Sequence, residues 1–191
     1  MALKFFEKSL PGVLLIEPMV FDDDRGYFME TYHTGKYSEA GLDQAFVQDN
    51  HSQSRQFTLR GLHYQLKHPQ GKLVYVITGE ILDIAVDIRS GSPTFGRWTG
   101  TLLSDKNKRQ LFIPGGFAHG FCVLSEIADV IYKCTDLYTP GDEYGILWSD
   151  PTIDIVWPIE NPGLSEKDAK NPLLKDVPAE HLPLYEAPDH E

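Results

Sequence analysis

Short apolar segments that alternate with polar residues and end in turns constrain the fold of this chain more than any other feature. Between residues 80 and 89 the apolar side chains occupy every second position, as in a strand with one buried face: Leu82, Ile84, Val86 and Ile88. Roughly ten such segments follow one another, with turn signals about every eight to twelve residues. This spacing predicts a mainly β protein, a sandwich or a barrel, rather than an α/β fold.

The other strand-like segments lie at residues 13–16, 27–32, 46–52, 97–103, 109–113, 119–124, 129–135 and 145–148, with two more between 59 and 77. Residues 34–41 are the one convincing helix of the first half, because Gly41 supplies a helix stop. Within the segment 46–52, the period of two places Gln48 and Asn50 on the same face of a strand.

The composition changes after Trp157 and Pro158 to a polar segment with prolines at positions 162, 172, 178, 183 and 188. Within this segment Ser165 is placed to cap a short helix, with Asp168 at the third helical position. We therefore expect residues 1–157 to form the β domain and residues 158–191 to form a helical or irregular appendage that lies on it. The last few residues are expected to be disordered.

The formal net charge of −11 limits the partners of the chain. A strongly acidic protein lacks the positive field of a general nucleic-acid binder, and an anionic ligand needs a local cationic pocket. No stretch has the length of a membrane span, residues 1–11 do not resemble a signal peptide, and the two cysteines fit small buried residues in a reducing compartment. We therefore expect a cytoplasmic, single-domain protein without a nucleic-acid or membrane partner.

Three ionisable side chains, Arg60, His63 and Lys72, lie on two neighbouring apolar strands, in the sequences RGLHYQ (60–65) and QGK (70–72). Such groups do not belong in a core unless something pairs them. A histidine that titrates near neutral pH beside two fixed cations suits proton abstraction from an anionic substrate. In a regular strand Arg60 and His63 would face opposite sides, so we expect a bulge at Gly61 to re-aim one of them.

Abstraction of a proton from a carbon next to a ketone requires a base, a group that stabilises the enolate oxygen, and an acid that returns the proton. If the stereocentre is inverted, the acid must act on the face opposite the base. His63 is the best candidate for the base and Lys72 for the stabilising group. Tyr132, in the apolar segment 129–135, is the candidate acid, because the acidity of a phenol is close to the basicity of an enolate.

These residues belong to a longer pattern of separated motifs. In order along the chain they are FDDDRGYF (21–28), QDN (48–50), RGLHYQ (60–65), QGK (70–72), PGGFAHG (114–120) and LSEKDA (164–169). In order and spacing they closely resemble the dTDP-4-dehydrorhamnose 3,5-epimerase family, over nearly the whole chain. Agreement among several separated motifs is a much stronger signal than any one of them.

The resemblance implies a cupin-type jelly-roll barrel that forms a homodimer, with an N-terminal strand that crosses between subunits. It implies that His63 is the base and that Asp168 orients and polarises it. Tyr132 would donate the proton and Lys72 would hold the C4 oxygen. The resemblance also implies a set of residues that line the substrate site: Arg25, Glu30, Gln48, Asn50, Arg60, Lys72, His119, Tyr138, Glu143 and Lys167.

The implied reaction converts dTDP-4-dehydro-6-deoxy-D-glucose into dTDP-4-dehydro-L-rhamnose, in the biosynthesis of dTDP-L-rhamnose. C3 and C5 both flank the C4 ketone, so one base and one acid can serve both centres in succession. No redox cofactor is expected, because nothing is oxidised.

Three other functions remain open. Inversion at C3 or C5 alone would use the same residues, and a non-catalytic protein would bind dTDP without exchanging sugar protons with solvent. A metal-dependent cupin oxygenase would need two histidines at alternate positions, a carboxylate and a further histidine. Because the strand reads His63-Tyr64-Gln65, and His63 with His119 makes a poor set of ligands, we expect no metal.

Overall fold

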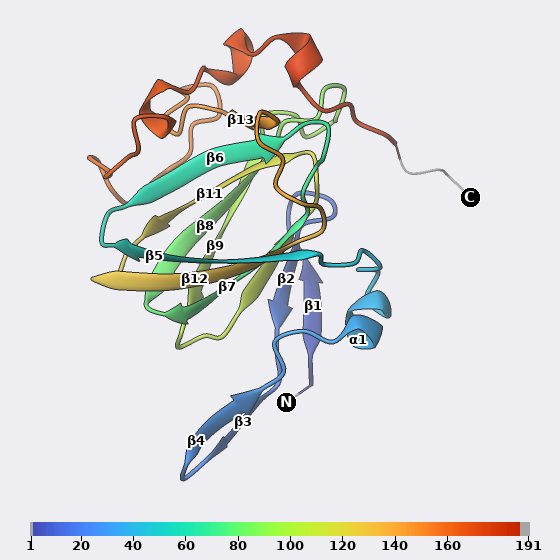
Figure 1. Ribbon diagram of the computed structural model, residues 1–191, viewed down its shortest axis with the longest axis vertical. Coiled ribbons are helices and arrows are strands. Elements are labelled where there is room, and N and C mark those ends of the chain that lie inside the picture. Colours follow the sequence, from blue (N-terminus) through green and yellow to red (C-terminus); the bar gives the residue numbers. More distant parts are fainter. Residues whose placement is uncertain (1, 188–191) are drawn as a thin grey trace.

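Two antiparallel sheets lie face to face in the computed structural model, which describes residues 2–187 (Figure 1). The six-stranded sheet contains, in spatial order, β1 (Lys4–Glu7), β2 (Leu14–Glu17), β10 (Gln110–Ile113), β7 (Lys72–Thr78), β12 (Ile127–Cys134) and β5 (Gln48–Arg55). The five-stranded sheet contains β13 (Glu143–Gly145), β6 (Leu59–Gln65), β11 (Phe117–Val123), β8 (Glu80–Asp87) and β9 (Trp98–Ser104). The predicted mainly β, cupin-like jelly roll is confirmed.

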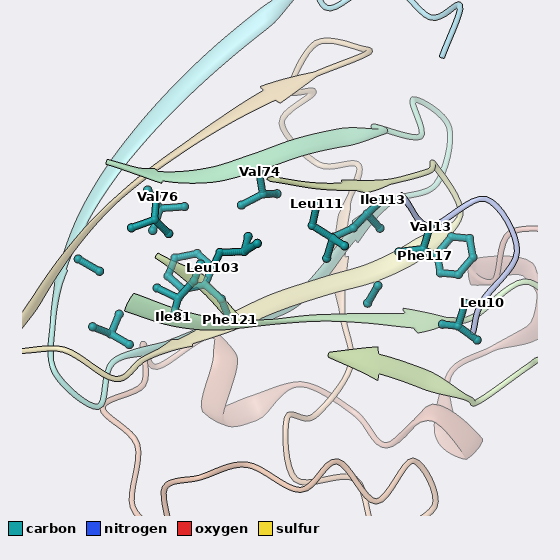
Figure 2. Close-up of a cluster of buried hydrophobic side chains, with 14 residues drawn as sticks. Leu10, Val13, Val74, Val76, Ile81, Leu103, Leu111, Ile113, Phe117 and Phe121 are labelled. Atoms are coloured by element: carbon teal, nitrogen blue, oxygen red, sulfur yellow. The ribbon is translucent and has the colours of Figure 1, made fainter. Parts of the chain in front are cut away.

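The main core fills the space between the two sheets (Figure 2). Val74 and Val76 of β7 and Leu111 of β10 point into it from the six-stranded sheet, and Ile81 of β8 and Phe121 of β11 point into it from the other. These side chains are at most 5% exposed, so their burial is a main source of the stability of the barrel.

The five-stranded sheet is covered on its outer face as well. Ile84 and Val86 of β8, and Ile88 directly after it, pack there in a second cluster with Leu174 from the C-terminal segment. Asp83, from the opposite set of β8, is completely buried. The two alternating sets of β8 side chains therefore lie in two different buried environments, whereas in a strand with one buried face one set would face solvent.

The C-terminal segment, residues 158–187, crosses this outer face as irregular chain with three short 3₁₀ turns (Figure 1). The turns span Asp168–Lys170, Leu174–Asp176 and Ala179–His181, and bridges at Thr58↔Gly163 and Ser90↔Leu184 attach the segment to the barrel. The Ser165 hydroxyl accepts the backbone N–H of Asp168 at 3.1 Å, as predicted, but the helix that follows is one 3₁₀ turn that begins at Asp168. The prediction that the last few residues are disordered falls on residues 188–191, which lie outside the described residues.

The boundaries of two predicted elements differ from the structure. Helix α1 (Thr34–Ser38) ends before Gly41, whose N–H donates to the Ser38 carbonyl in a turn. The strand predicted at 145–148 is misplaced, because β13 ends at Gly145 and the N–H of Leu147 instead donates to the Pro172 carbonyl of the C-terminal segment. The remaining predicted strands are present with shifts of a few residues at their ends.

A separate hairpin of β3 (Val20–Asp23) and β4 (Gly26–Met29) projects away from the barrel (Figure 1). Three of its aromatic side chains are exposed, Phe21 by 53%, Tyr27 by 52% and Phe28 by 68%. Within one chain, therefore, this hairpin leaves apolar surface uncovered.

Candidate active site

A cavity of about 300 Å³, within the range of small-molecule sites, is lined by strands of both sheets. Eight of the residues predicted from the sequence line it: Arg60, His63, Lys72, His119, Tyr132, Glu143, Lys167 and Asp168. They come from five strands and from the C-terminal segment, so the fold brings together residues that are distant in sequence.

Gly61 allows Arg60 and His63 to line the same cavity. The pairing of β6 with β11 shifts register by one residue between these two positions, so the expected bulge is present. Gly61 has a φ of +124°, and a Cβ at this position would lie 2.5 Å from the Cα of Gly120. Both facts require glycine, so the local sequence determines where the two side chains point.

His63 and Asp168 form a hydrogen-bonded pair, with 2.5 Å between Nε2 and Oδ1. Asp168 is 4% exposed. Burial opposes its ionisation, but hydrogen bonds and the charge of His63 outweigh burial and lower the pKa of Asp168 below its ordinary value. An ionised Asp168 accepts the Nε2 proton, which leaves Nδ1 as the basic nitrogen of a neutral His63.

Glu143 and Lys167 lie on the Nδ1 side of this imidazole. The Glu143 carboxylate is 3.9 Å from Nδ1 of His63 and forms an ion pair with Lys167. The pair keeps the carboxylate neutralised beside the candidate base.

Lys72 and Tyr132 occupy the wall formed by the six-stranded sheet, on the adjacent strands β7 and β12. Burial lowers the pKa of Lys72, and the negative charges of Asp83 and Glu143 offset part of this effect. Burial raises the pKa of Tyr132, so its phenol keeps its proton at neutral pH. The wall therefore presents a proton donor beside an amine that binds its proton less tightly than a solvated lysine.

Replacing Lys72 with Met should raise the melting temperature at pH 7, because it removes a charge that burial disfavours. The pKa of Lys72 is lower in the folded than in the unfolded chain, so the buried charge lowers the free energy of unfolding by its full amount at pH values below the folded pKa. This destabilisation decreases as the pH rises from the folded toward the unfolded pKa. The gain over wild type should therefore shrink toward pH 10. Thermal melts from pH 6 to 10 measure it, and a variant that is less stable than wild type throughout would contradict it.

A second buried His–Asp pair borders the cavity. His119 Nε2 lies 2.9 and 3.1 Å from the two carboxylate oxygens of Asp83, which is completely buried. His119 is also the cross-strand partner of His63. The imidazole of His119 is thus held in a fixed orientation at the cavity wall.

Gln48, Asn50 and Tyr138 form a connected group that is not part of the lining. Gln48 Nε2 donates to Asn50 Oδ1 at 3.1 Å, and the Tyr138 N–H donates to Gln48 Oε1 at 2.8 Å. Gln48 and Asn50 share one face of β5, as the period of two predicts.

Arg25 and Glu30 lie far from the cavity within this chain. Arg25 is at the tip of the β3–β4 hairpin, where its guanidinium pairs with Asp23 and 90% of its side chain is exposed. Glu30 follows β4 and pairs with Lys36 at 2.7 Å. One chain therefore does not bring these two predicted residues to the rest of the site.

Sequence reasoning missed Ser52 as a lining residue and Asp83 as the partner of His119. Ser52 follows Asn50 by two positions, so the period of two that selected Gln48 and Asn50 also points to it. Asp83 carried no comparable signal, because polar residues at alternate positions usually face solvent.

Across residues 2–187, no group of three or more His, Cys, Asp and Glu side chains is arranged to hold a metal ion. None of the helices in the same range has the length and apolar character that crossing a membrane requires. Both cysteines are buried and free.

A cupin-like barrel that encloses a His–Asp pair and a tyrosine around one cavity has the groups that an enzyme acting by proton transfer on a small ligand requires. The sequence model of dTDP-4-dehydrorhamnose 3,5-epimerase matches residues 7–176. The chain belongs to this family of isomerases.

Individual relatives agree with this assignment. The dTDP-4-dehydrorhamnose 3,5-epimerase of Shigella flexneri is 55% identical over 177 residues, which cover 92% of this chain and 98% of that protein. The enzyme of the same name from Neisseria gonorrhoeae is 54% identical over 167 residues, which cover 87% of this chain. The match spans only 51% of the length of that protein. Among solved structures, the chain is similar to a dTDP-6-deoxy-D-glucose-3,5-epimerase from Legionella pneumophila, crystallised in complex with dTDP-4-keto-L-rhamnose. The two chains are 50% identical and superpose with a TM-score of 0.95, and the match covers 97% of this chain and 100% of the other.

Proposed function

We propose that the chain converts dTDP-4-dehydro-6-deoxy-D-glucose into dTDP-4-dehydro-L-rhamnose by inverting C3 and C5, without a cofactor, in dTDP-L-rhamnose biosynthesis. His63, oriented by Asp168, removes each proton, and Tyr132 returns a proton to the opposite face. Lys72 holds the C4 oxygen while it carries negative charge.

The observation that carries this proposal is the position of the base and the acid on opposite walls. His63 comes from β6 of the five-stranded sheet and Tyr132 from β12 of the six-stranded sheet, and both line one cavity. A flat enolate between the two sheets would meet the base on one face and the acid on the other. Inversion requires this arrangement, whereas a binding protein does not.

Cationic side chains support a sugar nucleotide as the ligand. Although the chain carries a net charge of −11, Arg60, Lys72 and Lys167 all line the cavity. Arginine suits a diphosphate because its planar fork donates two hydrogen bonds to phosphate oxygens. We assign Gln48, Asn50 and the half-exposed ring of Tyr138 to the nucleotide end, because they lie next to the cavity but outside its lining.

Proton NMR of dTDP-4-dehydro-6-deoxy-D-glucose with the protein in deuterated water tests this function. Deuterium at both C3 and C5, with the L-lyxo product trapped by a reductase, supports the double epimerase. Exchange at a single carbon would instead establish a single-centre epimerase. If folded protein exchanged neither proton, the epimerase proposal would fail and the protein would be a sugar-nucleotide binder. If the purified protein then also contained stoichiometric transition metal, an oxygenase would be favoured.

We also propose that the protein acts as a homodimer in which the β3–β4 hairpin of each chain reaches the cavity of the other. The hairpin exposes Phe21, Tyr27 and Phe28, and its tip carries Arg25, far from its own cavity. Docking on a second copy would cover the aromatic side chains and bring a guanidinium to the bound diphosphate.

Replacing Phe28 with Glu should therefore weaken both the dimer and dTDP binding, because a charge would enter an apolar contact. Light scattering gives the molar mass and calorimetry gives the affinity, with Phe95→Glu, at another exposed aromatic side chain, as the control. A wild-type protein that is monomeric at all concentrations and binds dTDP tightly would contradict the dimer.

We place the reaction in the cytoplasm. The two cysteines are free and buried, as in proteins of a reducing compartment. Cell fractionation with an antibody against the protein tests this location.

A further inference from the structure

Strand β5 presents a row of polar side chains to the interior of the barrel. Gln48, Asn50, Ser52 and Ser54 are less exposed than the residues that alternate with them. Three of the four have hydrogen-bond partners, since Gln48 and Asn50 bond each other and Ser54 Oγ accepts Nε of Arg60 at 3.0 Å. Ser52 is the exception.

The hydroxyl of Ser52 is shielded from solvent and has no hydrogen-bond partner within the described part of the chain. Native proteins leave few buried hydroxyls unpaired, because each one loses its hydrogen bonds to water without replacement. Only two other buried side-chain atoms among residues 2–187 share this condition, Thr101 Oγ1 and Asn171 Nδ2, and neither residue lines the cavity. Ser52 does line it.

The neighbours of Ser52 are groups of the reaction site. On β12 its cross-strand partner is Val130, and Tyr132 is the partner of Asn50, so Ser52 and Tyr132 are diagonal neighbours. Both side chains line the cavity, together with Arg60. A serine hydroxyl can both donate and accept, and it rotates among staggered positions to meet a ligand.

We propose that Ser52 is a specificity residue whose hydroxyl bonds a hydroxyl group of the bound sugar. A neutral hydroxyl suits a neutral sugar hydroxyl, whereas the cations of the cavity suit the diphosphate. The nucleotide end is assigned to Gln48, Asn50 and Tyr138, which lie outside the lining. This inference rests on the proposed function only in taking a dTDP-sugar as the ligand.

Equilibrium binding of dTDP-glucose and of dTDP separates this contact from catalysis, because dTDP-glucose has no ketone and does not react. Ser52→Ala should weaken dTDP-glucose binding by about 2- to 13-fold, the range for loss of one neutral hydrogen bond, and leave dTDP binding unchanged. Its melting temperature without ligand should be equal to or above that of wild type, because an unpaired hydroxyl has been removed. Ser52→Cys keeps a similar size but bonds weakly, and should weaken dTDP-glucose binding in the same way.

Thr101→Val is the matched control, because it also removes a buried, unpaired hydroxyl but from a residue outside the lining. It should leave both affinities unchanged. Unchanged dTDP-glucose affinity in both Ser52 variants would overturn the proposal, and an equal loss of dTDP affinity would overturn the assignment to the sugar. If wild type bound dTDP-glucose but exchanged no sugar protons, the proposed epimerisation would fail while the binding test of Ser52 still stood.

Discussion

Replacing His63 with Ala should abolish deuterium incorporation at C3 and C5 while leaving dTDP affinity within about twofold of wild type. Without the imidazole, the cavity keeps Asp168 and Glu143, but Asp168 lies on the Nε2 side of the lost ring, away from the basic Nδ1, and Glu143 is paired with Lys167. A general base contributes about 10²- to 10⁴-fold to a rate, so exchange should fall at least that far. Binding of dTDP should survive because the diphosphate is held by cations that the substitution leaves in place.

His51→Ala provides the matched control for the loss of an imidazole. His51 is an exposed residue of β5 that pairs with Asp129 at 2.9 Å and does not line the cavity. It should keep wild-type exchange. Full exchange in a folded His63→Ala protein would remove His63 from the base role, and a loss of dTDP affinity as large as the loss of exchange would indicate a disrupted cavity instead.

Replacing Tyr132 with Phe should separate proton removal from inversion. The base remains in this variant, so deuterium should still enter the sugar from the His63 face, whereas net inversion should fall by about 10²- to 10⁴-fold because the donor on the opposite wall is lost. The pKa of Tyr132 is raised by burial, so the wild-type phenol is protonated and able to donate across the whole neutral range. Exchange is measured by NMR and inversion by trapping the product with a reductase.

The control for Tyr132 is Tyr75→Phe. Tyr75 lies on the adjacent strand β7 opposite Ile131 and does not line the cavity, so its loss of a hydroxyl should change neither rate. Equal losses of exchange and inversion in Tyr132→Phe would argue that the tyrosine also supports proton removal. An unchanged rate of inversion would assign the donor role to another group.

Much of the barrel could be predicted because its signal is local. The alternation in β8 and the apolar run of β7 are properties of single segments, and the structure contains both strands. The convergence of Arg60 and His63 was also predictable, because a glycine between them could supply the bulge that re-aims a side chain. Strand β3 was harder, since Asp22 and Asp23 are poor strand formers and the hairpin is held by its cross-strand pairs.

The parts that could not be predicted depend on partners far away in sequence. Nothing near Asp83 indicates that it will meet His119 inside the barrel, because that contact needs β8 and β11 to be neighbours. Likewise the pairing of this segment with β6 goes no further than Ile146, which still bonds Leu62, because the N–H of Leu147 donates to the Pro172 carbonyl of the C-terminal segment. Arg25 lies far from the cavity of its own chain because of the direction in which the hairpin leaves the barrel. No local sequence pattern indicates that direction.

The pair formed by His63 and Asp168 also has a consequence for the order in which the protein becomes competent. The two residues are 105 positions apart, and the carboxylate is made after every strand of the barrel. A chain in mid-synthesis therefore contains the cationic groups of β6 and β7 well before it contains the partner of its base. Under the proposed roles, damage confined to Asp168 should therefore yield molecules that still capture the sugar nucleotide but turn it over poorly.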